Sequence, residues 1–134
     1  MLSGMDTATA RPFQPDRDGW LRLFHTIDAR DATGFVEYLT PDAQFRFGNA
    51  PAVAGRDAIR GAVAAFFDTI AGSHHELLGT WAGDSSAVCE GRVTYTRHDG
   101  TAVGVPFVNV FELRGARISQ YRIYIDLSPL FGAH

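Results

Sequence analysis

The spacing of hydrophobic residues divides the chain into two parts that meet near Gly72. Before Gly72, apolar side chains recur every three or four residues, which is the spacing of amphipathic helices. After Gly72, apolar and polar residues alternate, as they do in half-buried strands. The chain has 134 residues, which is the usual size of one domain. The pattern therefore predicts a single α+β domain with its helices first.

The first part predicts three helices and one short strand. The first helical stretch begins at Asp16 with an acidic first turn. Asp31 precedes the second stretch, where an Asp side chain can cap free backbone N–H groups. Pro41 closes the second helix, because the residue before a proline avoids helical geometry. The predicted helices cover about residues 16–30, 31–40 and 55–72, and the strand covers 43–47. Residues 1–15 show no hydrophobic period, so we expect a disordered tail followed by one domain over 16–134.

The second part predicts four strands of a curved antiparallel sheet. They cover about residues 74–81, 86–98, 101–113 and 117–127. Asp99-Gly100 is typical of a two-residue hairpin loop, whereas Arg114-Gly115-Ala116 suits a loop of three residues. These short loops make neighbouring strands antiparallel, and their lengths fix which side chains share a face of the sheet.

The predicted hairpin register places a row of polar residues on one largely apolar face. A two-residue loop pairs Arg92 with Phe107 and Glu90 with Asn109. The next hairpin then brings Asn109 opposite Tyr121. If the connection between the first and second of these strands is also a tight hairpin, His75 on the first strand lies opposite Arg92. The predicted row is His75, Glu90, Arg92, Asn109 and Tyr121.

Each polar residue of this row has a catalytic and a structural interpretation. Glu90 on a desolvated wall could act as a proton shuttle, but Arg92 beside it equally favours an ion pair or an anion contact. His75 is a candidate general base or a satisfied structural histidine. Asn109 either hydrogen-bonds a ligand carbonyl or pairs with Glu90 and Tyr121. The sequence leaves these alternatives open.

Composition narrows the expected partners. The formal net charge is -3 and Lys and Arg form no run, so we expect neither nucleic acid nor a membrane as a partner. The single Cys89 lies in an apolar strand, which predicts a buried thiol and a reducing, cytoplasmic setting. His74 and His75 point to opposite faces of a strand, and no other spacing suits a metal. We therefore expect no metal and no cofactor.

Three segments of the chain resemble a known superfamily. They are Tyr38-Leu39-Thr40-Pro41-Asp42-Ala43, Gly55-Arg56-Asp57-Ala58-Ile59 and Tyr121-Arg122-Ile123-Tyr124-Ile125-Asp126. In this order they resemble the nuclear transport factor 2-like superfamily, and most of all its SnoaL-like, ketosteroid-isomerase-like branch. The resemblance implies a cone-shaped curved sheet wrapped around three N-terminal helices and enclosing a pocket. It also implies a homodimer formed through the outer face of the sheet.

The resemblance implies pocket positions without the chemistry of the superfamily's enzymes. The base and the oxyanion-binding Asp of ketosteroid isomerase correspond to Phe47 and Asn109 here. The Arg of limonene epoxide hydrolase corresponds to Arg92, and its two Asp positions to Thr94 and Ile123. Register and resemblance together predict ligand contacts at Arg92, Asn109, Tyr121, Phe47, Thr94, Phe107 and Ile123, with His75 and Glu90 as catalytic candidates.

Three functions are compatible with this reading of the sequence. The first is a small-molecule-binding domain with an apolar aromatic pocket and no evident strong catalysis. The second is a cofactor-independent isomerase, cyclase or hydratase acting on a polyketide-like or steroid-like carbonyl compound, with His75 or Glu90 moving the proton. A hydrolase is the remaining enzymatic possibility. The third function is a dimerisation or interaction module without a ligand.

Overall fold

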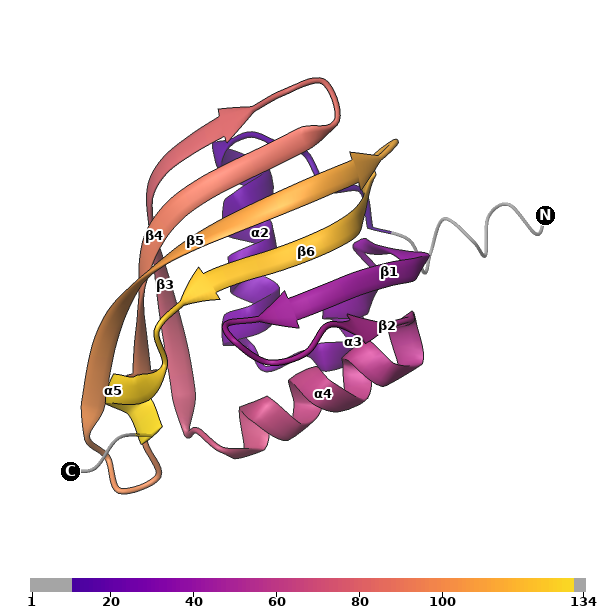
Figure 1. The fold of residues 1–134 in the computed structure, drawn as a ribbon. Coiled ribbons are helices and arrows are strands. Elements are labelled where there is room, and N and C mark those ends of the chain that lie inside the picture. Colours follow the sequence, from indigo (N-terminus) through magenta and orange to yellow (C-terminus); the bar gives the residue numbers. More distant parts are fainter. Residues whose placement is uncertain (1–10, 132–134) are drawn as a thin grey trace.

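The computed structural model describes residues 11–131, which form a bent six-stranded sheet and four helices (Figure 1). The helices are α2 (Arg17–Asp28), α3 (Ala32–Val36), α4 (Arg56–Asp68) and α5 (Ser128–Phe131). The strands are β1 (Leu39–Phe47), β2 (Val53–Ala54), β3 (Gly72–Ala82), β4 (Ser86–Thr96), β5 (Ala102–Arg114) and β6 (Arg117–Ile125). The predicted α+β class, with a curved sheet around three N-terminal helices, is confirmed.

The strand order across the sheet is β2-β1-β6-β5-β4-β3. Strands β3 to β6 form the predicted antiparallel meander. Strand β1 is the exception, because it pairs with β6 in parallel. The sheet bends around α2, and α4 lies below β1 and β2 (Figure 1). The sheet does not close, so its concave face and the helices bound an interior space.

The helices begin where the sequence predicts and end earlier. Asp31 accepts a hydrogen bond from the backbone of Gly34, so the predicted N-cap is confirmed. Asp16 caps α2 in the same way, by accepting a hydrogen bond from the backbone of Gly19. Helix α3 stops at Val36, and the segment around Pro41 belongs to β1. Helix α4 stops at Asp68, so that Gly72 starts β3 and does not terminate a helix.

The predicted tail of residues 1–15 is too long, because residues 11–15 are part of the folded domain. Phe13 is only 2% exposed, and its ring packs edge-on against Trp20 at a centroid distance of 5.1 Å. Its backbone N–H donates to the carbonyl of Ala116 at 2.7 Å. Residues 11–15 are therefore part of the folded domain, because one aromatic side chain anchors them without any periodic pattern. Residues 1–10 of the predicted tail lie outside the described residues.

The loop between β4 and β5 corrects the predicted register. Arg97 and Thr101 are joined by a backbone hydrogen bond, and the N–H of Gly100 donates to the carbonyl of Arg97. Gly100 has φ +88°, a left-handed conformation that closes a three-residue loop with a bulge. The loop therefore contains one residue more than a two-residue Asp-Gly turn.

This one-residue difference moves every β4 side chain to the other face relative to the prediction. Asn109 lies opposite Cys89 and not opposite Glu90, and Arg92 lies opposite Pro106. The predicted pairing across this hairpin was wrong. As a consequence, Glu90, Arg92 and Thr94 belong to the convex face, whereas Cys89, Gly91, Val93 and Tyr95 belong to the concave face. The pairing across the next hairpin was also wrong, because Asn109 lies opposite Ile123 and not opposite Tyr121, and the loop after Arg114 holds only Gly115 and Ala116.

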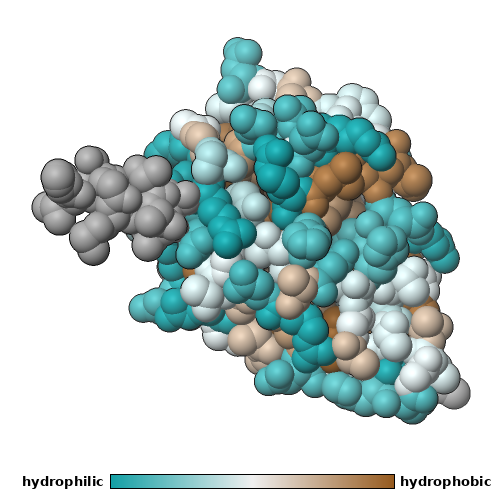
Figure 2. Space-filling model, turned by 180° about the vertical axis from the view of Figure 1, so that it is seen from behind, coloured by the Kyte–Doolittle hydropathy of each residue, from teal (hydrophilic) through white to brown (hydrophobic). Residues whose placement is uncertain are grey.

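Apolar side chains are concentrated in the interior of the described domain. Seen from behind, much of the surface is hydrophilic, and the hydrophobic colour gathers in a patch toward the upper right (Figure 2). The exposed large hydrophobic residues are Leu21, Leu78, Trp81, Tyr124 and Phe131. The buried hydrophobic residues form one core cluster, which includes Phe13, Trp20 and Leu130.

Candidate functional site

A cavity of about 220 Å³ lies between the concave face of the sheet and the helices. Its wall is mostly apolar and rich in phenylalanine, with side chains from α3, β1, α4 and β5 among those that line it. The phenylalanines of this wall are Phe35, Phe45, Phe47, Phe66, Phe67 and Phe107. Polar groups are few and come from Ser73, His75, Tyr95, Asn109 and Tyr121. Such a composition suits a hydrophobic molecule that is oriented by a small number of polar contacts.

The structure brings six of the nine predicted site residues to this cavity. These are His75, Asn109, Tyr121, Phe47, Phe107 and Ile123. The other three do not line it. Glu90 is exposed and borders a shallow groove on the convex face with Tyr124 and Asp126. Arg92 is also exposed and donates from Nη2 to the carbonyl of Gly104 at 3.2 Å.

Thr94 is half-buried and lies opposite Gly104 on β5. It shares the convex face with Glu90 and Arg92 because all three are an even number of residues apart along β4. The register correction described above therefore accounts for all three displaced residues at once.

His75 is held at the cavity by a carboxylate that the sequence reading missed. Asp28 lies at the end of α2, and its Oδ1 contacts His75 Nδ1 at 2.6 Å. Oδ2 of Asp28 accepts the backbone N–H of His75 at 3.0 Å, and Ser73 donates its hydroxyl to Oδ1 at 2.8 Å. Three donors from one strand thus converge on a single carboxylate.

Aromatic rings fix the plane of the His75 imidazole. Phe24, one helical turn before Asp28 on α2, stacks on it at a centroid distance of 4.8 Å with an interplanar angle of 15°. Phe107 from β5 meets it edge-on at 5.4 Å. The spacing of Phe24 and Asp28 is the signal that was available in the sequence, because residues four apart lie on the same face of a helix.

The environment of Asp28 keeps its carboxyl ionised. Burial raises the pKa of Asp28, but hydrogen bonds from His75 and Ser73 together with the attraction of His75 outweigh this and hold the pKa below its usual value. An ionised Asp28 fixes the N–H of the imidazole at Nδ1. Nε2 is then the free basic nitrogen of a side chain that lines the cavity.

Asn109 supplies the second polar feature of the cavity. Its side chain is 2% exposed, and its Oδ1 has no hydrogen-bond partner among the described residues. Burial raises the pKa of Tyr121 well above its usual value, and the nearby Cys89 and Tyr95 add to this effect. Burial also raises the pKa of Tyr95, with a contribution from Asp28. Both phenols are therefore neutral hydrogen-bond donors at physiological pH.

Cys89 takes no part in the chemistry of the cavity. The residue is buried, as predicted, and it does not line the wall. Burial raises the pKa of its thiol to about 12, partly offset by a hydrogen bond from the backbone of Asn109. A thiol with so high a pKa holds its proton and is a poor nucleophile.

No three His, Cys, Asp or Glu side chains among residues 11–131 come close enough together to hold a metal ion. None of the helices described here has the length and apolar character needed to cross a membrane.

The structure is an α+β domain whose curved sheet and helices enclose an apolar cavity. The family model described as "SnoaL-like domain" matches residues 20–121. The chain therefore belongs to the SnoaL-like domain family. None of the curated proteins compared with the chain matches it.

Solved structures with the same fold include two that are described as polyketide cyclases. A structure described as a SnoaL-like polyketide cyclase from Jannaschia sp. CCS1 has a TM-score of 0.75 and 22% identity, covering 85% of this chain and 87% of its own. TerC, co-crystallised with polyporic acid, has a TM-score of 0.75 and 17% identity, covering 88% and 96%.

A ketosteroid-isomerase-like protein from Catenulispora acidiphila, in complex with trimethylamine, has a TM-score of 0.75 and 16% identity, covering 81% of this chain and 85% of its own. The TM-scores of these three structures show that they share the fold of this chain.

Proposed function

We propose that the protein binds a hydrophobic small molecule in the cavity and transfers a proton on it, with His75 as the base. The observation that carries this proposal is the His75–Asp28 contact of 2.6 Å at the wall of an otherwise apolar cavity. Asp28 acts as a positioning residue, because it fixes the tautomer and plane of the imidazole without facing the ligand. Apolar surroundings strengthen the interaction between such a base and a weakly acidic C–H group.

The reaction class that fits best is removal of a proton from carbon next to a carbonyl group. Such a step is the start of many isomerisations, cyclisations and dehydrations, and it needs only a positioned base and a hydrogen-bond donor for the developing oxyanion. The neutral hydroxyls of Tyr95 and Tyr121 are the candidate donors, since both residues line the cavity. The polyketide cyclase among the structural neighbours supports this class by analogy of fold alone.

Hydrogen–deuterium exchange tests the proposal directly. We expect the protein in D₂O to accelerate exchange of the α-protons of small aromatic ketones, such as acetophenone and 1-indanone, measured by proton NMR. His75→Ala should lower the accelerated rate by about 100-fold or more, the usual contribution of a general base. The matched control is His74→Ala, because His74 is the adjacent residue and faces the convex side opposite Thr94.

Two outcomes would count against the proposal. If exchange persists in His75→Ala, the base lies elsewhere. If the ketones bind but no exchange occurs, the protein is a ligand-binding domain, which is the alternative that an apolar cavity also supports. Thermal unfolding of each variant separates loss of the base from loss of the fold.

The homodimer through the convex face and the cytoplasmic location remain proposals based on the family resemblance and the single cysteine. Size-exclusion chromatography with light scattering tests the first, and cell fractionation tests the second.

A further inference from the structure

We infer that Phe66 on α4 sets the upper size of the ligand, so that the cavity takes a compound with one ring and keeps out a compound with two. The inference rests on the proposed function, because it concerns the molecule that occupies the same cavity. Two features carry it: the position of the cavity's opening, and the contacts of the side chain that stands there.

The exposed residues of the wall locate the opening of the cavity. Ala50 and Pro51, in the connection between β1 and β2, line the cavity and are exposed to solvent, as is Ala62 on α4. Tyr121 and Phe107 also line it but are only 1% and 3% exposed. The cavity therefore meets the surface between α4 and the β1–β2 connection, and the sheet closes its far side.

Helix α4 contributes an inner and an outer row of side chains to the wall. Val63 and Phe67 are buried and form the inner row. Ala62 is exposed and Phe66 is half-buried, and these two form the outer row. Residues four apart lie on the same side of a helix, so Phe66 shares with Ala62 the side that borders the opening. Phe66 is the bulky member of this outer row.

The ring of Phe66 contacts two strands that are not neighbours in the sheet. It meets Phe47, at the end of β1, edge-on at a centroid distance of 4.8 Å, and it meets Tyr95 on β4 edge-on at 5.6 Å. Strands β6 and β5 separate β1 from β4. One ring reaches both strands because the sheet bends, while α4 runs below β1 toward the start of β3 (Figure 1). The Phe66 ring therefore stands across the concave face and narrows the cavity at its opening.

The volume behind this ring suits about one ring of a ligand. A cavity of about 150 Å³ in another protein holds benzene, and this cavity measures about 220 Å³. In proportion to volume, it holds about nine non-hydrogen atoms, which is one substituted ring. A second ring has to extend through the opening, where the Phe66 ring stands. Truncation of Phe66 to Ala removes that obstacle and leaves the inner row of α4 in place.

Two acetophenones with the same acetyl group test the size limit. Acetophenone has one ring, and 4-phenylacetophenone carries a second ring opposite the acetyl group. The second ring adds apolar area, which strengthens binding wherever the ring finds room. By calorimetry, we expect the wild type to bind the two-ring ketone about tenfold more weakly than acetophenone. Phe66→Ala should reverse this order and bind the two-ring ketone about tenfold more tightly than acetophenone.

Three further variants make the test specific to the opening. Phe131→Ala is the matched control, because Phe131 is exposed on α5 and does not line the cavity, and it should keep the order of the wild type. Ala62→Phe adds a second ring to the outer row and should weaken binding of acetophenone itself about tenfold. Phe66→Leu retains part of the bulk and should give an intermediate ratio, which also serves if Phe66→Ala does not fold. Thermal unfolding of each variant verifies the fold.

A wild type that already prefers the two-ring ketone, an order of affinities that Phe66→Ala and Phe66→Leu leave unchanged, or no binding of either ketone would overturn the inference. Exchange of the acetyl protons in the same samples separates it from the proposed function. Exchange that depends on His75, with no effect of Phe66 on the order, leaves only proton transfer standing. A reversal of the order in Phe66→Ala without exchange leaves only the size limit standing.

Discussion

The two faces of the same strands differ in almost every property. On β4, the concave residues Cys89, Val93 and Tyr95 are buried, whereas Glu90 and Arg92 on the convex face are exposed. Charged side chains thus lie outside, and the polar groups inside are neutral or, like His75, paired with one carboxylate. The difference teaches that hairpin register alone decides which residues of a strand can meet a ligand.

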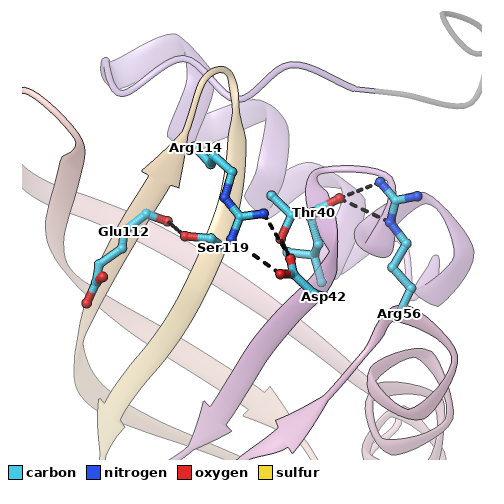
Figure 3. Close-up of polar contacts among 7 residues, drawn as sticks. Thr40, Asp42, Arg56, Glu112, Arg114 and Ser119 are labelled. Carbon is cyan, nitrogen blue, oxygen red and sulfur yellow. Dashed lines mark hydrogen bonds and ion pairs between the residues drawn. The ribbon is translucent and has the colours of Figure 1, made fainter.

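Charges on the outer surface serve to connect strands. Arg114 on β5 donates a hydrogen bond to Asp42 on β1 at 3.1 Å, and Asp42 also accepts one from the hydroxyl of Thr40. Nearby, Arg56 on α4 donates to the carbonyl of Leu39 on β1 (Figure 3). Hydrogen bonds from Arg114 and Thr40 lower the pKa of Asp42. Exposed pairs of this kind contribute little to stability, so the concave face should carry most of the energetic and functional sensitivity.

The largest expected effect is on the stability of the concave face. Phe111 is fully buried and packs against Phe13, Trp20 and Tyr121. Phe111→Ala should lower the free energy of unfolding by about 3 to 5 kcal/mol, because it leaves a cavity among these rings. The next residue, Glu112, is exposed, and Glu112→Ala should cost less than about 1 kcal/mol. Urea unfolding of both variants checks the difference, and similar losses would contradict it.

The next effect concerns Asp28 and depends on pH. Because the folded-state pKa of Asp28 is lowered, its carboxylate stabilises the fold above its ordinary pKa, near 4, and this contribution is lost as pH falls through the folded-state value. Asp28→Asn should therefore be less stable than the wild type by about 1 to 3 kcal/mol at neutral pH. The gap should narrow as the pH falls below about 4.

Urea unfolding at several pH values measures this gap for Asp28→Asn. Asp57→Asn is the control, since the side chain of Asp57 is 93% exposed. A gap that stays constant down to acidic pH would show that the carboxylate is not the source of the stability.

Hydrophobic periodicity predicts most of the fold because the spacing of apolar residues within each helix or strand identifies the face that it buries. It gives the helices that begin near Asp16, Asp31 and Gly55 and the alternating strands after Gly72. Loop length is a weaker signal: Asp99-Gly100 suits a two-residue loop, yet Gly100 equally suits the left-handed end of a three-residue loop. That ambiguity displaced Glu90 from its predicted place.

Contacts between distant segments could not be obtained from periodicity. Asp28 and His75 meet because α2 packs against β3, which is a property of the assembled fold. The parallel pairing of β1 with β6 likewise joins segments far apart in the sequence. Phe13 lies outside any periodic stretch, and only its burial against Trp20 reveals its role.

A smaller effect tests the loop that sets the register. Gly100→Ala places a side chain at φ +88° and should destabilise the protein by about 1 to 2 kcal/mol. Gly61→Ala should act in the opposite direction, by up to about 1 kcal/mol, because Gly61 lies inside α4 with open space around its added methyl group. Thermal or urea unfolding compares the two, and equal signs would contradict the assigned loop geometry.

The smallest expected effect is the sharpest test of the two faces. Arg92 was predicted to contact a ligand, but in the structure its exposed guanidinium reaches only the carbonyl of Gly104 among the bonds described for it. Arg92→Ala should change the free energy of unfolding by less than about 0.5 kcal/mol. Ligand affinity and exchange rate should also be unchanged, because the side chain and the cavity lie on opposite sides of β4.

Glu90→Ala should behave in the same way as Arg92→Ala, since both residues lie on the convex face. The comparison is decisive because the predicted and observed registers differ by one residue and give opposite expectations for these two variants. With the predicted register, each truncation would open the polar row of the ligand site and weaken binding of the acetophenones. A loss of affinity in both variants, with stability unchanged, would place Glu90 and Arg92 on the concave face of β4 beside Asn109, as the predicted register has it.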